Sequence, residues 1–162
     1  MFGFLKKKKT KGFSLGSPVK GATISLKEVN DPTFREGMLG EGVAIKPTEG
    51  KIYAPADGSI GMVFDTLHAI SLTTMEGAEV LIHVGLDTVK MEGKAVKSYV
   101  KAGDTVKKGD LLLEADLEKI KSAGYDDVTA MIICNTDQYA DVSGICGKEV
   151  NPGEDIVVIQ TK

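Results

Sequence analysis

Short runs of apolar and β-branched residues, separated by glycine, follow one another along most of this chain of 162 residues. The 19 glycines and the recurring turn signals are typical of an all-β sandwich or barrel. Residues 116–123 instead have the pattern of a short helix, with Asp116 as N-cap and Gly124 beyond its end. We predict an antiparallel β-sandwich or barrel with Greek-key-like hairpins and one or two short helices. Besides a central hairpin, the predicted strands are residues 19–26, 42–45, 51–54, 96–100, 111–114, 128–134, 144–148 and 156–159.

The central stretch, residues 60–87, has the pattern of one β-hairpin and contains both histidines of the chain. Its first strand, residues 60–72, alternates with a period of two, as strands do. One face of this strand carries Phe64, Thr66, His68, Ile70 and Leu72. The second strand, residues 79–85, carries Leu81 and His83 on one face.

A turn at Glu76 and Gly77 would set the register of this hairpin. It places His68 opposite His83, with Cβ atoms roughly 5 Å apart. The same register places Ile70 opposite Leu81. The hairpin therefore predicts a pair of facing imidazoles in an apolar surround.

The charge of the chain is divided unevenly. Five lysines and no acid lie in residues 1–11, whereas residues 12–162 hold 15 basic and 23 acidic residues, a balance of −8. Such an acidic body is a poor nucleic-acid binder. We expect residues 1–17 to be a flexible basic tail and residues 18–162 to form a single domain. The polybasic and apolar residues 1–11 suit an anionic membrane surface, although a merely solubilising leader is the alternative.

Other features concern the compartment. No apolar run reaches the length of a membrane span, and the lysines follow the first apolar residues, whereas a signal peptide has its charges first. Cys134 and Cys146 lack C-x-x-C spacing and indicate a reducing compartment. We therefore expect a cytoplasmic protein, with peripheral contact at the inner face of the membrane if the tail binds there.

Two other functions are compatible with parts of the sequence. The phrases at residues 54–61 and 101–112 resemble biotinyl and lipoyl carrier domains, for which Lys90 would be the nearest candidate for modification. A zinc-dependent hydrolase could use His68, His83 and Asp87 as ligands, but the chain has no third histidine.

Four phrases of the chain carry a family resemblance: GEGVAIKP at residues 40–47, YAPADGSI at 53–60, TLHAI at 66–70 and LIHVGLDTV at 81–89. They resemble the glucose-type enzyme IIA proteins of the bacterial phosphoenolpyruvate-dependent sugar phosphotransferase system, from about residue 17 to residue 162. The resemblance implies an antiparallel β-sandwich that takes a phosphoryl group from the phosphocarrier HPr. It also implies that the phosphoryl group passes on to a cysteine in the IIB domain of a membrane sugar transporter.

The resemblance also implies roles for individual residues. The I-H-x-G-x-D-T phrase makes His83 the phosphorylated residue, and the T-x-H-A phrase makes His68 its partner and Thr66 a hydroxyl donor. A neutral imidazole has a free lone pair, and a second imidazole nearby discourages protonation of both. No cofactor is required, although His68 and His83 could hold a weak zinc ion completed by a partner's carboxylate. The expected partner-docking residues are Phe34, Leu39, Phe64, Ile70, Leu81, Asp87 and Val89.

Overall fold

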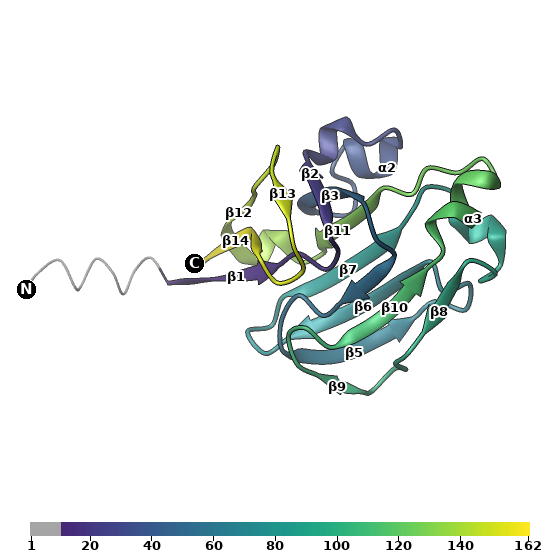
Figure 1. The fold of residues 1–162 in the computed structure, drawn as a ribbon. Coiled ribbons are helices and arrows are strands. Elements are labelled where there is room, and N and C mark those ends of the chain that lie inside the picture. Colours follow the sequence, from purple (N-terminus) through teal and green to yellow (C-terminus); the bar gives the residue numbers. More distant parts are fainter. Residues whose placement is uncertain (1–10) are drawn as a thin grey trace, which may run out of the picture.

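A computed structural model describes residues 11–162 of the chain. The predicted membrane contact of residues 1–11 therefore lies almost entirely outside the described residues. Figure 1 shows a β-rich fold in which short helices lie at the edges. The helical elements are η1 (Leu26–Glu28), α2 (Pro32–Arg35), η2 (Thr88–Met91), α3 (Leu117–Ser122) and η3 (Thr136–Gln138).

The strands form three antiparallel sheets. The largest has the order β13-β2-β3-β11-β7-β6-β5-β9, and the two small ones have the orders β1-β14-β12 and β4-β10-β8. They stack in a sandwich-like arrangement, and no closed barrel forms among residues 11–162. The strands are β1 (Gly12–Gly16), β2 (Gly21–Ile24), β3 (Glu41–Pro47), β4 (Lys51–Tyr53), β5 (Gly58–Val63), β6 (Ala69–Thr74), β7 (Glu79–Val84), β8 (Val96–Ser98), β9 (Thr105–Val106), β10 (Leu111–Ala115), β11 (Thr129–Ile133), β12 (Tyr139–Gly144), β13 (Glu149–Val150) and β14 (Asp155–Thr161).

Strand β11 shows how the large sheet is buried on both faces. All five of its residues are buried. Met131 and Ile133 point into the main core, which β10 and β14 help to form. Ala130 and Ile132 point to the opposite face, into a second cluster with Phe34 of α2. Burial on both faces explains the nearly continuous apolar sequence of this strand.

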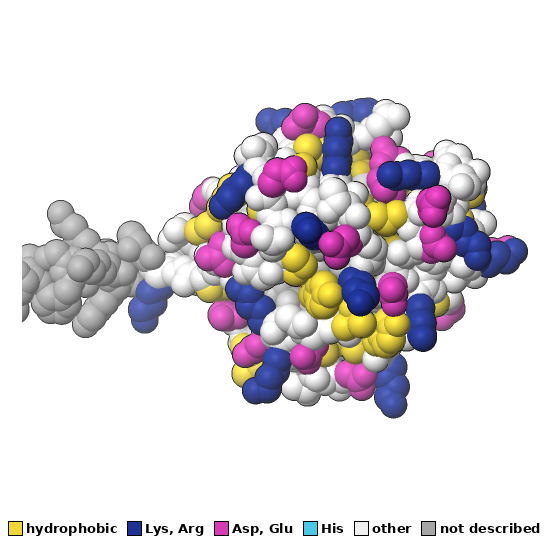
Figure 2. All heavy atoms as spheres, in the orientation of Figure 1, with side chains coloured by type: hydrophobic (Ala, Val, Ile, Leu, Met, Phe, Trp, Pro, Cys, Tyr) yellow, Lys and Arg dark blue, Asp and Glu magenta, His cyan; other side chains and the backbone are white. Residues whose placement is uncertain are grey.

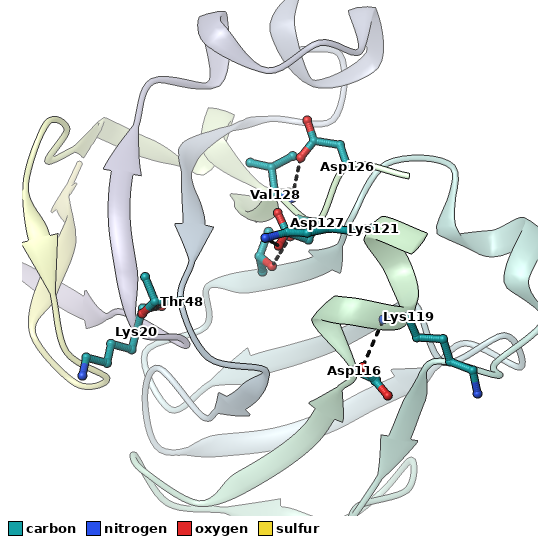
Figure 3. A network of polar contacts seen from close by, with 9 residues as sticks. Lys20, Thr48, Asp116, Lys119, Lys121, Asp126, Asp127 and Val128 are labelled. Carbon is teal, nitrogen blue, oxygen red and sulfur yellow. Dashed lines mark hydrogen bonds and ion pairs between the residues drawn. The ribbon is translucent and has the colours of Figure 1, made fainter. Parts of the chain in front are cut away.

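The predicted short helix is confirmed as α3. The carboxylate of Asp116 accepts a hydrogen bond from the backbone N–H of Lys119 at 3.1 Å, which caps the helix (Figure 3). Gly124 follows with φ of +91°, a conformation that glycine adopts without strain. Lys121 reaches from the same helix to Asp127, with Nζ and Oδ2 3.3 Å apart, and so ties the helix to the start of β11.

Two strand predictions and part of the predicted tail were wrong. Residues 60–72 do not form one strand, because the chain turns at residues 64–68 between β5 and β6. Residues 12–16, predicted to belong to a flexible tail, form β1 and pair with β14. Residues 144–148 do not form a strand of their own, because Gly144 ends β12 and residues 145–148 connect β12 to β13.

The surface is of mixed charge, and Figure 2 shows basic and acidic side chains interspersed over the face that it draws. In residues 11–162, no helix is both long and apolar enough to span a membrane.

Candidate active site

The loop of the β5–β6 hairpin supplies one half of the site. Phe64 N–H donates to the carbonyl of Ala69 at 3.1 Å, and Leu67 N–H donates to the carbonyl of Phe64 at 2.7 Å. These two bonds close the loop that carries Thr66 and His68. Within it, Thr66 Oγ1 lies 2.5 Å from Nδ1 of His68, so the hydroxyl fixes the rotation of the imidazole.

The end of β7 supplies the other half. His83 lies between β6 and β11, where its direct cross-strand partners are Ala69 and Ala130. Because directly opposed residues share a face, two methyl groups flank the imidazole and leave it room. Nδ1 of His83 lies 2.8 Å from the carbonyl oxygen of Gly85. A carbonyl can only accept, so Nδ1 carries the proton and Nε2 keeps its lone pair.

The predicted meeting of the two imidazoles is confirmed. The ring centroids of His68 and His83 lie 4.9 Å apart at an interplanar angle of 77°. The predicted register is wrong by one residue, since His83 pairs with Ala69 rather than with His68. Edge-to-face contacts extend the pair on both sides, from Phe34 to His83 at 5.0 Å and from Phe64 to His68 at 5.4 Å.

The environment keeps both imidazoles neutral at pH 7. Burial, followed by the neighbouring His68, lowers the pKa of His83 from 6.5 to about 4. The bond to Gly85 and the carboxylates of Asp31 and Asp87 oppose this shift but do not cancel it. Burial also lowers the pKa of His68. The site therefore presents an unprotonated imidazole nitrogen beside a second neutral imidazole.

The predicted docking residues divide into three groups. Ile70 is fully buried in the main core, because it pairs with Ile82 on the face away from the histidines, and its assignment to a docking surface is wrong. Phe34 is buried as well but supports His83 from below the surface. The remaining members, Leu39, Phe64, Leu81, Asp87 and Val89, are exposed or half-buried.

Two residues that influence the site were not predicted. Gly85 accepts the hydrogen bond from His83 Nδ1, and the I-H-x-G spacing was the signal that could have indicated it. Asp31 is the N-cap of α2 and acts on His83 by its charge. It lies far from His83 in sequence, and no local pattern connects the two.

The fit of the site to a metal ion is limited. Among residues 11–162, no group of three or more His, Cys, Asp or Glu side chains is placed to hold a metal ion. His68 and His83 could supply two imidazole ligands at most, and a further ligand would have to come from another molecule.

Comparison with known proteins decides the family. Residues 13–139 match the family described as phosphoenolpyruvate-dependent sugar phosphotransferase system, EIIA 1. The chain belongs to this EIIA family. Its members are phosphotransferase components that act through a phosphohistidine, and EIIA domains work with HPr and with IIB domains of sugar transporters.

Relatives of two architectures resemble this EIIA chain. The glucose-specific EIIA component of Oceanobacillus iheyensis is 42% identical over 154 residues, which cover 95% of this chain and 93% of the relative. The β-glucoside-specific EIIBCA component of Bacillus subtilis is 51% identical over 124 residues, which cover 76% of this chain but only 20% of the relative. The chain thus spans about a fifth of the length of such EIIBCA relatives.

A solved EIIA structure confirms the fold. Glucose permease IIA from Mycoplasma capricolum superposes with a TM-score of 0.83 at 33% identity, covering 91% of this chain and 96% of that protein. Family membership also removes the biotinyl and lipoyl reading, for which Lys90 was the candidate. Lys90 lies in η2 rather than at the tip of a hairpin. Membership of the EIIA family likewise excludes the interpretation as a zinc-dependent hydrolase.

Proposed function

We propose that Nε2 of His83 accepts a phosphoryl group from phospho-HPr and passes it to the cysteine of a IIB domain. The hydrogen bond from His83 Nδ1 to Gly85 O carries this proposal, because it leaves Nε2 as the only ring nitrogen with a free lone pair. The low pKa of His83 keeps that lone pair unprotonated at pH 7. On acceptance, the Nε2–P bond forms as the bond to HPr breaks.

His68 and Thr66 complete the proposed chemistry. When the Thr66 hydroxyl donates to Nδ1 of His68, the proton of that imidazole resides on Nε2. The Nε2–H group can then donate to an oxygen of the phosphoryl group on His83, whose ring lies beside it. Phosphoryl transfer depends mainly on positioning and charge stabilisation, and this arrangement supplies both from neutral groups.

A partner would dock on the apolar rim of the site. Leu39 and Val89 are 36% and 45% exposed, and Phe64 and Leu81 line a shallow cavity beside Met62. An apolar rim around a small polar centre suits protein partners that must bind and leave. The named relatives are glucose-specific and β-glucoside-specific components, so we propose a glucose-type sugar. The proposed place of action is the cytoplasm.

We propose that no metal ion is needed for this carrier function. The residues that the reaction uses are two imidazoles and a hydroxyl, and phosphoryl transfer between side chains needs no further group. A zinc ion could bridge His68, His83 and a carboxylate of a partner, as a contact between proteins rather than a catalyst. Isothermal titration with zinc chloride should then give only weak binding to the isolated chain.

The carrier function is tested by mass spectrometry after incubation with phosphoenolpyruvate, enzyme I and HPr. The wild-type chain should gain one phosphoryl group, and acid should release it. His83→Ala should gain none, whereas His68→Ala should gain one. A phosphoryl group retained on His83→Ala would contradict the assignment.

A further inference from the structure

Leu67 has an unusual backbone conformation at the centre of the site. It separates Thr66 from His68 and has φ of +58°, in the left-handed region that residues with a Cβ rarely adopt. Among residues 11–162, only Asp87 and Glu92 are further non-glycine residues of this kind. A strained backbone residue between two predicted site residues calls for a physical reason.

The strand register supplies that reason. Val84 N–H donates to the carbonyl of His68 at 2.7 Å, which continues the β6–β7 ladder by one residue and sets His68 opposite Val84. Val84 points into the main core, whereas His83 points to the other face. A regular strand through residue 68 would therefore turn its imidazole away from His83. The rings nevertheless lie 4.9 Å apart, so the backbone departs from strand geometry just before His68.

We propose that the left-handed conformation of Leu67 brings the imidazole of His68 to His83, which makes Leu67 a positioning residue for onward phosphoryl transfer. The geometric part is independent of what the site does. The part concerning transfer rests on the proposed carrier function.

Neighbouring groups hold Leu67 in this conformation. Its N–H donates to the carbonyl of Phe64 at 2.7 Å. Its side chain lies over Gly93, where a Cβ atom would stand 3.7 Å from Leu67 Cδ1 and 3.6 Å from the carbonyl oxygen of Thr66. Gly93 is itself left-handed, with φ of +81°, as is Glu92. Two sharply turned loops thus lie against each other beside His68.

The test compares substitutions that differ in their tolerance of positive φ. Leu67→Val keeps an apolar side chain but strongly disfavours the left-handed region, whereas Leu67→Gly and Leu67→Asn accept it. The first readout is the imidazole titration of His83, followed by NMR in the isolated chain. The second is the rate of transfer to a IIB domain, measured beside the rate of acceptance from phospho-HPr.

In Leu67→Val, the titration midpoint of His83 should rise, because the neighbouring His68 helps to lower it. Onward transfer should slow by about tenfold or more, as expected when a reacting group is misplaced. Acceptance should stay within about threefold of wild type, given that His83 keeps its bond to Gly85. Leu67→Gly and Leu67→Asn should behave like wild type in all three measurements.

Several results would overturn the proposal. An unchanged His83 midpoint in Leu67→Val would show that another element positions His68. Equal losses in Leu67→Gly and Leu67→Val would assign the effect to the leucine side chain rather than to the backbone. A raised His83 midpoint in Leu67→Val with an unchanged rate of transfer to the IIB domain would show that Leu67 has no role in transfer. If His83 still accepts the phosphoryl group in that variant, the proposed carrier function is unaffected.

Discussion

Nδ1 of His83 lies 2.8 Å from the carbonyl oxygen of Gly85, two residues further along the chain. This approach depends on Gly85 having φ of +76°. A Cβ atom there would collide with Thr88 Cγ2 and would stand 2.8 Å from the carbonyl oxygen of Asp126. The orientation of the proposed nucleophile is therefore tied to a position that only glycine fits.

Gly85→Ala should consequently impair both stability and acceptance. The clash and the positive φ together should lower the free energy of unfolding by roughly 1–3 kcal/mol. Acceptance should fall by about tenfold or more, because Nδ1 loses its fixed acceptor and Nε2 its fixed direction. Urea unfolding and the rate of labelling from phospho-HPr measure the two effects. Gly77→Ala is the matched control, since Gly77 also has positive φ but nothing lies within 4 Å of its Cβ position.

His68→Gln should separate the two transfer steps. Glutamine keeps an N–H donor near the phosphoryl group but cannot reproduce the fixed imidazole, so acceptance should persist while transfer to a IIB domain slows by about 10²-fold or more. Rapid-quench measurement of each half-reaction decides this. Complete loss of acceptance would mean that His68 is needed for both steps.

The pKa of His83 makes a prediction about pH. NMR titration should give a midpoint near 4 for this residue, far below the ordinary value of 6.5. Between these two values the unfolded chain binds more protons at this position than the folded chain. The free energy of unfolding should therefore rise with pH between about 4 and 6.5, with a slope of at most about 1.4 kcal/mol per pH unit. Above pH 6.5 the titration of His83 should cause no further change.

His83→Gln supplies the comparison for this pH dependence. The variant should lose much of the rise in unfolding free energy between pH 4 and 6.5, because it has no imidazole to titrate at that position. Equal slopes in the two proteins would show that the burial of His83 does not shift its titration.

The apolar rim predicts an effect on docking without an effect on folding. Leu39→Asp and Val89→Asp should each weaken binding to HPr by about tenfold, the loss expected for an interface position of moderate importance. Met75→Asp is the control, because Met75 is 77% exposed at the β6–β7 turn, the opposite end of the hairpin from His83. Surface plasmon resonance with immobilised HPr compares the three. Equal weakening in the control would indicate a general charge effect.

The basic residues near the N-terminus predict membrane contact. The full chain should sediment with vesicles of anionic lipid at low salt and be released at high salt, since each lysine near such a surface contributes about 1 kcal/mol. Replacing Lys6, Lys7, Lys8 and Lys9 with glutamine should abolish sedimentation. Binding that survives this replacement would leave these lysines without the role.

The sequence predicted the fold class and the meeting of the two imidazoles. The prediction was wrong where the period-two alternation was extended through residues 64–68, which form a turn between β5 and β6. The sequence of residues 60–72 does alternate with a period of two, but the left-handed backbone of Leu67 interrupts the strand. A leucine in this conformation has no signal in the sequence. Ile70 was predicted to share a face with His83. The observed register differs by one residue, so Ile70 pairs with Ile82 and lies on the opposite face. The contribution of Asp31 depends on the packing of α2 and could not be predicted from local pattern.

Strand β1 lies beside β14 along its whole length, with Gly12 paired to Gln160 and both Thr161 N–H and its hydroxyl bonded to the carbonyl of Lys11 (Figure 1). The first and last described residues are therefore neighbours. A few added residues could join them into a ring, and the ring could be reopened at an exposed turn such as Met75 to Gly77. The histidine pair should survive such a permutation, because the break falls at the end of the β6–β7 hairpin away from His68 and His83, and β7 stays paired with β6 and β11.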